Sequence, residues 1–381
     1  MSDLTKAAIM VRRFRGATGA SRLICEQIRL LSQQQCNVSI YAEKIGSDIK
    51  KVLPESTRFY KQFKLPIKGY YSRVFFDYLC SLKTTKGQFD FTIGHGDVVK
   101  QDVLFLHNTI RLADELVVSD NDRNISYHGK LQDILFKKRH FALCVANSVL
   151  MKDDLCNRYQ LDETNVNIIY PGYDKKQFSP YNRKDISIAI RKKMAIDDDN
   201  IVVSFITSGD FKKRGLDIFL KTLSLLPKQV SCRLSIIILG RRENIERYLM
   251  KHSYPLSKKQ LQIIDKTSRI SDIYHATDIL FYPARYEEFG MVVQEAIACG
   301  AAVVSSARVG STELLVDSAR ETIIDRPDID DFVSLLTSLL TKGPQYIAQL
   351  AAVQYRCIVD NTYDDYNRHF LKLMKKQGFL S

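Results

Sequence analysis

Short runs of hydrophobic residues alternate along this chain with longer stretches in which apolar residues recur at helical spacing. Near the N-terminus, the apolar run at residues 7–11 is followed by Gly16, Gly19 and an amphipathic stretch at residues 21–34, and residues 38–41 form the next short run. Such runs are typical of buried strands, and the stretch between them is typical of a helix. The order of strand, helix and strand predicts a crossover between two parallel strands.

The same alternation continues in two series. The first series has further apolar runs at residues 89–93, 103–106, 143–146 and 166–170. After a turn-rich break at residues 171–182, the second series has strands at residues 201–206, 234–239, 279–282 and 302–305 and helices at residues 215–226 and 287–299. We therefore predict an α/β protein with two doubly wound parallel sheets. The predicted domains are residues 1–180 and 181–344, and a last segment, residues 345–381, is helical over residues 346–374.

The length and charge of the chain agree with this organisation. A chain of 381 residues exceeds what one hydrophobic core usually serves, and a hydrophobic fraction of 45% can supply two cores. The 56 Lys and Arg residues exceed the 43 Asp and Glu residues, which gives a formal net charge of +13. This excess favours an anionic partner such as a phosphate donor, an acidic lipid surface or a nucleic acid.

Cysteine usage and hydropathy indicate the compartment. The eight cysteines form no Cys-x-x-Cys pair, so we expect reduced thiols rather than a zinc site or a disulfide framework. The N-terminus shows no apolar run of signal-peptide length, and no uninterrupted apolar run is long enough to span a bilayer. We therefore expect a cytoplasmic protein whose membrane contact, if any, is peripheral.

The strongest candidate site follows the predicted strand at residues 279–282. In parallel sheets, ligands bind beyond the carboxyl ends of the strands. Gly290 lets backbone amides approach a ligand at the start of a helix, where phosphate is favoured, and Glu295 can accept hydrogen bonds from sugar hydroxyls. The other residues of interest in this segment are Glu287, Phe289 and Met291. The competing interpretation is an ordinary amphipathic helix with acidic residues in its first turn.

A second candidate follows the predicted strand at residues 201–206. Lys213 and Arg214 stand directly before Gly215, at the expected start of a helix. Two cations in this position can neutralise a diphosphate leaving group, and a guanidinium can bind it through two hydrogen bonds. The competing interpretation is a solvated basic turn.

The first domain contributes Gly19 and His107. Gly19, in the loop after the first strand, allows close backbone approach to a phosphate or an acceptor, although a glycine there can also serve an ordinary turn. His107 ends a predicted strand at the carboxyl edge of the sheet. His95 is the competing histidine, and Asp97 next to it can accept a hydrogen bond from an acceptor hydroxyl.

These segments together resemble the retaining glycosyltransferases of family 4, whose Glu-x7-Glu motif is followed by Ala and, further on, by Cys-Gly or Ala-Gly. The resemblance implies that Glu287 contacts the donor sugar and that Glu295 contacts the nucleotide ribose. It also implies that His107 contacts the donor sugar. The segment at residues 208–217 resembles the diphosphate clamp of the family, which usually has Lys where this chain has Arg214.

Weaker matches extend the resemblance over most of the chain. Thr18 and Gly19 occupy the place of a glycine pair, and residues 169–174 are similar to the linker motif of the family. The segment at residues 309–313 resembles a Gly-Gly-x-x-Glu loop in which Ser311 replaces the second glycine.

The resemblance implies a GT-B fold, in which two Rossmann-like domains face each other across a cleft, with the nucleotide-sugar donor on the second domain and the acceptor on the first. It also implies that the last helical segment, residues 345–381, crosses back to the first domain. His107 and Glu287 are then catalytic, and the donor is held by Gly19, Lys213, Arg214, Phe289, Gly290, Met291 and Glu295. No metal or other cofactor is expected. Retention is expected to proceed by front-face attack, in which a donor phosphate oxygen takes the acceptor proton.

The similarity is strongest to lipopolysaccharide core glucosyltransferases, which implies a hexose, from a UDP-sugar, transferred to a glycan or glycolipid acceptor of the cell envelope. Two alternatives stay open. One is a membrane scaffold that binds a sugar nucleotide without turnover, and the other is a GT-B epimerase that acts on the nucleotide-sugar alone.

Residues 50–76 combine cations with aromatic rings and contain one acidic residue, Glu55. The cations are Lys50, Lys51, Arg58, Lys61, Lys64, Lys68 and Arg73, and the rings are Phe59, Tyr60, Phe63, Tyr70, Tyr71, Phe75 and Phe76. This composition predicts peripheral contact with the anionic inner face of the cell membrane. Acceptor binding, a solvated face and single-stranded nucleic acid are the alternatives, and residues 137–139 form a second basic cluster.

Overall fold

The computed structural model describes residues 4–16, 18–67, 69–85, 87–117, 127–207, 209–252, 254, 257 and 259–380, without the side chains of residues 127 and 128. Ser208 and Lys68, which belong to two of the segments singled out above, lie outside the described residues. The chain divides into two compact units. The first is Met1–Pro171 together with Tyr363–Ser381, and the second is Gly172–Thr362.

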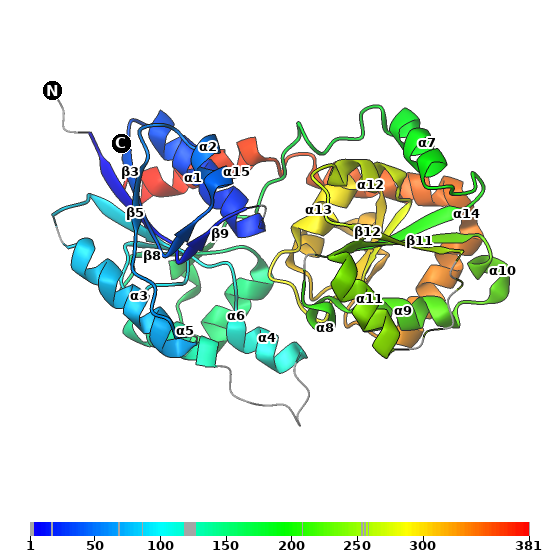
Figure 1. Ribbon diagram of the computed structural model, residues 1–381, viewed down its shortest axis with the longest axis horizontal. Helices are drawn as coiled ribbons and strands as arrows, with labels where there is room; N and C mark the ends of the chain where they lie inside the picture. The colour runs from blue at the N-terminus through cyan, green and yellow to red at the C-terminus, as the bar shows by residue number, and fades with distance from the viewer. Residues whose placement is uncertain are drawn as a thin grey trace. The chain divides into compact units, whose positions relative to one another are not determined.

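The described residues of the first unit form a seven-stranded parallel sheet in the order β5-β3-β1-β6-β7-β8-β9 (Figure 1). The strands are β1 (Lys6–Met10), β3 (Asn37–Ala42), β5 (Arg58–Lys61), β6 (Phe91–Gly94), β7 (Val103–Phe105), β8 (Leu143–Ala146) and β9 (Val166–Ile168). The helices are α1 (Gly19–Gln33), α2 (Ser47–Val52), α3 (Tyr70–Lys83), α4 (Ile110–Val117), α5 (Tyr127–Lys138), α6 (Val149–Tyr159) and α15 (Tyr363–Lys376). A short ladder, β2 (Arg13–Phe14) with β4 (Lys44–Ile45), and the turn η2 (Glu163–Asn165) complete the unit.

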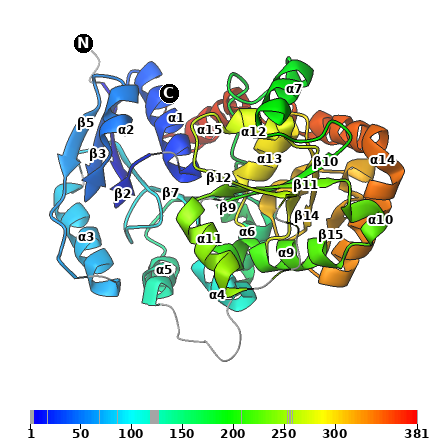
Figure 2. The ribbon, with the colours of Figure 1, turned by 45° about the vertical axis from the view of Figure 1, so that its right-hand side comes forward.

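Both faces of this sheet are buried, which explains why its strands are continuous apolar runs. Along β1, Ala7 and Ile9 belong to a cluster with residues of α1 and α15, whereas Ala8 and Met10 belong to a cluster with Phe76 of α3. Alternate residues of a strand point to opposite faces, so one strand supplies both layers. Figures 1 and 2 show α1 and α15 on one face of the sheet and α3 and α5 on the other.

The described residues of the second unit form a six-stranded parallel sheet in the order β12-β11-β10-β13-β14-β15. The strands are β10 (Ile201–Ile206), β11 (Leu234–Gly240), β12 (Leu261–Asp265), β13 (Ile279–Tyr282), β14 (Ala302–Ser306) and β15 (Ile323–Ile324). The helices are α7 (Arg183–Lys193), α8 (Phe211–Arg214), α9 (Leu216–Leu225), α10 (Lys228–Ser231), α11 (Arg242–Lys251), α12 (Ile270–Ala276), α13 (Met291–Ala298) and α14 (Ile329–Ile358). The turns η3 (Gly310–Leu314) and η4 (Asp317–Arg320) follow β14.

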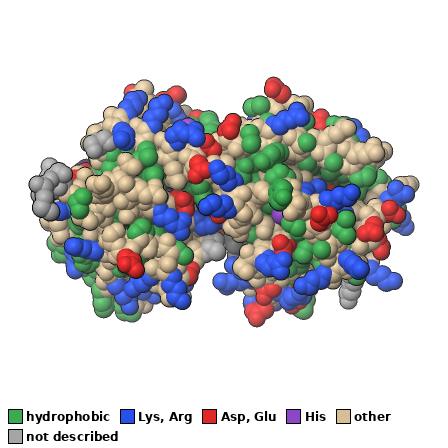
Figure 3. All heavy atoms as spheres, turned by 90° about the horizontal axis from the view of Figure 1, so that it is seen from above, with side chains coloured by type: hydrophobic (Ala, Val, Ile, Leu, Met, Phe, Trp, Pro, Cys, Tyr) green, Lys and Arg blue, Asp and Glu red, His purple; other side chains and the backbone are tan. Residues whose placement is uncertain are grey.

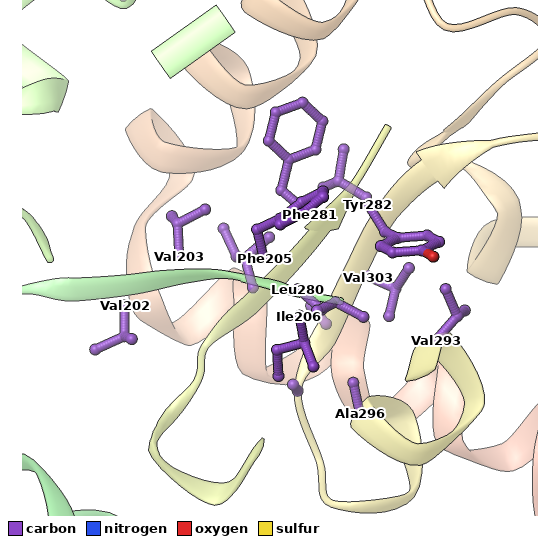
Figure 4. Close-up of a cluster of buried hydrophobic side chains, with 14 of the residues drawn as sticks. Val202, Val203, Phe205, Ile206, Leu280, Phe281, Tyr282, Val293, Ala296 and Val303 are labelled. Carbon is purple, nitrogen blue, oxygen red and sulfur yellow. The ribbon is translucent and has the colours of Figure 1, made fainter. Parts of the chain in front are cut away.

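The core of the second unit lies beneath the candidate site. Figure 4 shows Phe205 of β10 and Tyr282 of β13 among neighbours from β14 and α13, and the rings of Phe205 and Tyr282 stack with centroids 5.9 Å apart. All of β13 and all of β14 is buried. The loops that follow these strands therefore begin at well-packed, buried residues.

The predicted α/β fold with two doubly wound parallel sheets is confirmed. Two helix boundaries differ from the prediction. The helix expected at residues 287–299 begins only at Met291, because Gly290 has φ +85° and its predecessors pair with another loop. Glu295 is consequently little more than one turn into α13, rather than about two turns in as the sequence suggested.

The long helix expected at residues 346–374 is also different. The structure has α14 and α15, separated at residues 359–362, and α14 is itself kinked where Gly343 is non-helical and Pro344 follows. Residues 345–362 pack within the second unit, so the segment that belongs to the first unit begins at Tyr363 rather than at residue 345. The division between the units falls after Pro171, earlier than the predicted boundary near residue 180.

The chain returns to the first unit through α15. In the buried contact between α15 and α1, the side-chain amide of Gln27 donates a hydrogen bond of 2.7 Å to the hydroxyl of Tyr366. Tyr366, Phe370 and Met374 of α15 are part of the main hydrophobic cluster of this unit. The last helix therefore completes one face of the first sheet.

The order of strands defines one switch point in each sheet. The chain adds β3 and β5 on one side of β1 and then β6, β7, β8 and β9 on the other side. In the second unit it adds β11 and β12 beside β10 and then returns to place β13 on the opposite side. At these points the loops after two neighbouring strands diverge, and ligands bind there in open α/β sheets.

Two further properties bear on the predicted compartment. All eight cysteines are free thiols in the fold. No helix among the described residues is both long and apolar enough to cross a bilayer.

Gln354 joins α14 to the sheet through buried hydrogen bonds. Its side-chain oxygen accepts from the Val303 amide at 2.7 Å, and its side-chain nitrogen donates to the Val303 carbonyl at 3.1 Å and to the Thr322 hydroxyl at 3.1 Å. We expect Gln354→Leu to lower the free energy of unfolding by about 3 kcal/mol, since it leaves buried polar groups unpaired. Urea unfolding measures this change. Gln349→Leu, at an exposed position of the same helix, should change it by less than about 0.5 kcal/mol, and equal values for the two variants would contradict the assignment.

Candidate functional site

Three loops meet at the switch point of the second sheet. They follow β10, β13 and β14, and backbone hydrogen bonds hold them together. The Arg285 amide donates to the Lys213 carbonyl at 2.9 Å, which joins the first two loops. The Glu287 amide donates to Arg308 at 2.9 Å, and the Gly310 amide donates to Glu287 at 3.1 Å, which joins the second and third loops.

Two ion pairs cross from the loop after β10 to the loop after β13. Lys213 Nζ lies 2.6 Å from Glu288 Oε2, and Arg214 Nε lies 3.1 Å from Glu287 Oε2. Lys213 also lies over the ring of Tyr286, 5.1 Å from its centroid. The structure thus brings together Lys213, Arg214 and Glu287, which the sequence had placed in separate motifs, and it adds Glu288.

Burial changes the acid–base properties of these groups. Desolvation raises the pKa of Glu288, although Lys213 opposes the shift. Burial acts to lower the pKa of Arg214, but Tyr282 and Glu287 outweigh it and raise that pKa overall. Burial also raises the pKa of the Tyr282 phenol, which donates a hydrogen bond to Glu287 at 3.3 Å. Arg214 is therefore held as a cation beside a neutral phenol.

The start of α13 is shaped for close approach of a ligand. Gly290 is the N-cap, with φ +85°, and a Cβ atom there would lie 2.7 Å from Val309 Cγ1. No side chain caps the helix, and its first turn contains no acidic residue. Ser311, which departs from the family pattern, donates a hydrogen bond of 3.1 Å to the Gly290 carbonyl. The competing interpretation, an amphipathic helix with acidic residues in its first turn, is wrong, because Glu287 and Glu288 precede the helix.

Phe289 and Met291 lie at the start of α13, and Glu295 is the fifth of its eight residues. Phe289 is buried, and Met291 is the first residue of the helix and is partly exposed. Glu295 is 2% exposed and accepts a hydrogen bond of 3.1 Å from the Tyr274 hydroxyl. Removing this carboxylate would leave the Tyr274 hydroxyl without that partner, so we expect Glu295→Ala to lower the thermal stability of the protein.

The turn that carries the two cations is itself fixed. Asp210 caps α8 by accepting from the Lys213 amide at 3.0 Å. Gly215 follows with φ +75°, and a Cβ atom there would lie 2.0 Å from the Pro283 carbonyl oxygen, so only glycine fits. Arg285 then makes a two-pronged salt bridge to Asp217, with distances of 2.7 and 2.6 Å. The cations are therefore part of a rigid turn rather than of a solvated one.

In the first unit, His95 and His107 form a hydrogen-bonded pair at the carboxyl ends of β6 and β7. His95 Nδ1 lies 2.9 Å from His107 Nε2, and the two rings stack with centroids 5.1 Å apart. Burial lowers the pKa of His107 to about 4, and burial with the help of His107 lowers the pKa of His95 well below its ordinary value. The two histidines, which the sequence treated as competitors, form one neutral unit.

The other candidates of the first unit have defined places. Gly19 is the first residue of α1, and Thr18 before it caps the helix by accepting from the Ser21 amide at 3.2 Å. Asp97 is engaged within the fold, since it accepts from the Arg12 amide at 2.9 Å and pairs with Arg73 at 3.3 Å. The interpretation of Asp97 as a direct partner of an acceptor hydroxyl is therefore weakened.

Sequence reasoning missed three groups of this site. Glu288 lies within the Glu-x7-Glu motif, and its position next to Glu287 was the signal that could have found it. Tyr282 ends a buried strand at the carboxyl edge, which is where functional side chains are expected. Tyr274 carried no comparable signal, because its contact with Glu295 depends on the packing of α12 against α13. Within the described part of the chain, no group of three or more His, Cys, Asp or Glu side chains is arranged to hold a metal ion.

The second unit contains a segment that is similar to a known protein family. Residues 187–352 match the family model described as glycosyl transferases group 1. The chain is 25% identical over 219 residues to a D-inositol 3-phosphate glycosyltransferase of Mycobacterium sp. (strain KMS), and 27% identical over 225 residues to one of Rhodococcus jostii (strain RHA1). These matches cover 55% of this chain and 47% and 46% of the relatives, so the chain matches about half the length of the curated relatives. Residues 187–352 are thus similar to the glycosyl transferases group 1 family.

Solved structures show the same fold over nearly the whole chain. WaaG, a glycosyltransferase involved in lipopolysaccharide biosynthesis, has a TM-score of 0.79 at 16% identity, over 96% of this chain and 99% of that protein. Anabaena Alr3699/HepE, solved in complex with UDP-glucose, has a TM-score of 0.72 at 14% identity, over 97% and 99% of the two chains. The two Rossmann-like units thus have the GT-B fold.

The histidine pair makes stability depend on pH. An unfolded histidine takes up a proton near pH 6.5, whereas folded His107 does so only near pH 4. Stability from this residue is therefore fully present above the unfolded value and is lost as the pH falls toward the folded one. Between about pH 7 and pH 4, the free energy of unfolding of wild type should fall by up to about 3 kcal/mol more than that of His107→Gln.

Denaturant unfolding at several pH values measures this effect. His252→Gln is the matched control, because His252 is exposed at the end of α11. An identical pH dependence in wild type and His107→Gln would show that the imidazole of His107 titrates normally in the fold.

Proposed function

We propose that this protein is a retaining glycosyltransferase, of the family 4 type, that moves a hexose from a nucleotide-sugar to a glycan or glycolipid acceptor. The observation that carries the proposal is the convergence of Lys213, Arg214 and the acidic pair on the N-terminus of α13 at the switch point of the second sheet. Such a site offers cations and amides for a diphosphate and carboxylates for sugar hydroxyls. The match of residues 187–352 to the family model of glycosyl transferases group 1 supports it.

The donor and the acceptor are inferred from the similar proteins. The complex of Alr3699/HepE with UDP-glucose supports a UDP-sugar donor for this chain. The role of WaaG in lipopolysaccharide biosynthesis supports an acceptor of the cell envelope. The acceptor is assigned to the first unit, and the donor to the second.

The geometry suggests how the leaving group is stabilised. As the bond between the sugar and the diphosphate breaks, negative charge grows on the phosphate oxygens. Lys213, Arg214 and the amides near Gly290 would bind that charge from fixed positions, which is the most effective form of electrostatic catalysis. Since fixed cations can take the part that Mg²⁺ plays elsewhere, we infer that no metal is required.

The ion pairs also assign a role to the carboxylates. In the structure Glu287 and Glu288 balance the charge of Arg214 and Lys213. When a diphosphate draws on the same cations, the carboxylate of Glu287 becomes available to accept hydrogen bonds from sugar hydroxyls. Glu287 therefore serves as a sugar-binding catalytic residue, and Glu288 keeps Lys213 in place.

His107 is assigned a role without charge. Its pKa of about 4 means that it is a neutral imidazole near pH 7. It would hydrogen-bond the donor sugar rather than protonate it. The acceptor oxygen attacks the anomeric carbon on the face that the phosphate leaves, its proton passes to a phosphate oxygen, and the configuration is retained.

A turnover experiment tests the function. The purified protein is incubated with UDP-, GDP- and ADP-sugars, with and without a membrane glycolipid extract, and nucleoside diphosphate release and the configuration of the product are followed. Acceptor-dependent release with retention is expected, and EDTA should leave it intact. Isomerisation without acceptor would identify an epimerase, binding without turnover would identify a scaffold, and a loss that Mg²⁺ restores would contradict the metal-free mechanism.

Glu295→Gln should weaken donor binding while preserving the fold. The amide oxygen can still accept from Tyr274, but the charge that would hold two ribose hydroxyls is lost, so we expect UDP affinity to fall about tenfold. Calorimetric titration with UDP measures the change. Glu243→Gln removes an equal charge at an exposed position of α11, and if it weakens UDP binding as much as Glu295→Gln does, Glu295 is not part of the donor site.

We also propose that the first unit contacts the inner face of the cell membrane, which would make this a cytoplasmic, peripheral protein. Phe63 is 65% exposed and Tyr71 is 72% exposed, close in sequence to the exposed cations Arg58, Lys61 and Lys64. Aromatic rings and cations side by side suit an anionic interface. On the face shown in Figure 3, Lys and Arg side chains are spread over both units, so the net charge by itself singles out no membrane surface there.

Changing Arg58, Lys61 and Lys64 together to Glu should abolish most binding to anionic vesicles, since each cation contributes about 1 kcal/mol near such a surface. Co-sedimentation at low salt measures this, and the attraction of wild type should fade as the Debye length falls from about 10 Å at 0.1 M to about 3 Å at 1 M. The control changes Lys192, Lys193 and Lys228, exposed on the second unit, to Glu. Full sedimentation of the first triple variant would assign membrane contact elsewhere, with residues 137–139 as the next candidate.

A further inference from the structure

A pocket of about 340 Å³ opens at the switch point of the first sheet. Arg12, in the loop after β1, and Arg13, the first residue of β2, line one side of it, and Asp97 lines it from the loop after β6. Lys64, from the segment after β5, and Arg73, from the first turn of α3, complete its charged wall. The pocket lies where the strand order predicts a ligand, and its wall is dominated by cations.

The charges of this wall do not cancel. Arg12 pairs with the buried Glu43 at 3.0 Å, and Arg73 pairs with Asp97 at 3.3 Å. Arg13 and Lys64 are exposed and form no ion pair among the residues that the structure describes. The four cations therefore face two carboxylates, and two positive charges are left for a ligand.

Hydrogen-bond donors are also left over. Arg73 Nε is buried and has no hydrogen-bond partner among the described residues. Burial lowers the pKa of Arg73 even though Asp97 opposes the shift, so its counter-charge is incomplete. Gly69, the N-cap of α3, lines the pocket as well, and α3 has neither a side-chain cap nor an acidic residue in its first turn. Its first amides and its dipole face an anion favourably.

The positions of these groups are fixed by the fold. The Arg12 amide donates to Asp97 at 2.9 Å, which ties the loops after β1 and β6 together. The guanidinium of Arg12 donates to Ser72 of α3 at 3.4 Å. Three of the four segments that line the pocket are thus held to one another.

We propose that this pocket binds a phosphate monoester, and that the acceptor of the reaction carries that group. Two uncompensated positive charges match the charge of a monoester, which approaches −2 near pH 7. Pro66 and Ile67, exposed at the same pocket, would contact the less polar part of the acceptor. The assignment of the phosphate to the acceptor rests on the proposed transferase function, whereas the binding of a phosphate monoester does not.

The test uses glycerol 3-phosphate as a soluble probe, with glycerol and a phosphate diester, glycerophosphocholine, as controls. Calorimetric titration of the full chain should show binding of the monoester alone, weakening below about pH 6 as the monoester takes up a proton. Arg13→Gln with Lys64→Gln should weaken this binding roughly tenfold or more. Both residues are outside the ion pairs of the fold, so the variant should stay folded. Lys192→Gln with Lys193→Gln removes equal charge from the exposed end of α7, outside the pocket, and should leave monoester binding unchanged.

The outcomes separate the two proposals and the two sources of phosphate. Equal weakening by both double variants, or no binding of the monoester, overturns the pocket assignment even if UDP binding and turnover persist. Monoester binding in a protein without turnover keeps the pocket and removes the transferase. Tighter binding to phosphatidic acid vesicles than to glycerol 3-phosphate, weakened by Arg13→Gln alone and kept in the α7 variant, assigns the phosphate to a lipid-borne acceptor, because Arg13 lies outside the cations proposed for membrane contact. Equal binding of the two probes assigns it to a soluble one.

Discussion

Each sheet of this protein has to bury both of its faces, and this constraint positions everything else. A parallel strand can be connected to the next only by a crossover that covers one face, so covering both faces requires the chain to reverse its direction along the sheet. The reversal leaves neighbouring strands, β1 with β6 and β10 with β13, whose following loops diverge. The charged clusters described above lie at these two places, which indicates that they follow from the topology.

At the switch point of the second unit, two cationic side chains are held in fixed positions by ion pairs. Lys213 and Arg214 would repel each other on a short turn if they were left alone, and the acidic pair from the loop after β13 balances them. The paired side chains also keep their positions, because backbone hydrogen bonds join the loops after β10, β13 and β14. A diphosphate would therefore meet donors that are already oriented, which reduces the reorganisation needed as charge develops.

The switch point of the first unit differs from that of the second in its charge balance. It also gathers cations, but only two of the four are balanced by carboxylates. Nearby, at the ends of β6 and β7, His95 and His107 are kept neutral by burial. An anionic group is favoured in the pocket, while uncharged hydrogen bonding is favoured at the histidines. A phosphorylated acceptor would suit the pocket, and the uncharged donor sugar would suit His107.

The sequence by itself determined the two parallel sheets, most of the strand positions and the motif residues Lys213, Arg214, Glu287 and Glu295, because these depend on local periodicity and on short motifs. It misplaced the start of α13 and the break between α14 and α15, since the first depends on pairing between Glu287 and Val309 and the second on where the chain leaves one core for another. Only the tertiary structure decided which charges meet. Glu288 with Lys213, His95 with His107, and Arg12 with Glu43 are joined by the side-by-side packing of distant segments, and the energy of such contacts depends on separation in space, which local sequence patterns do not encode.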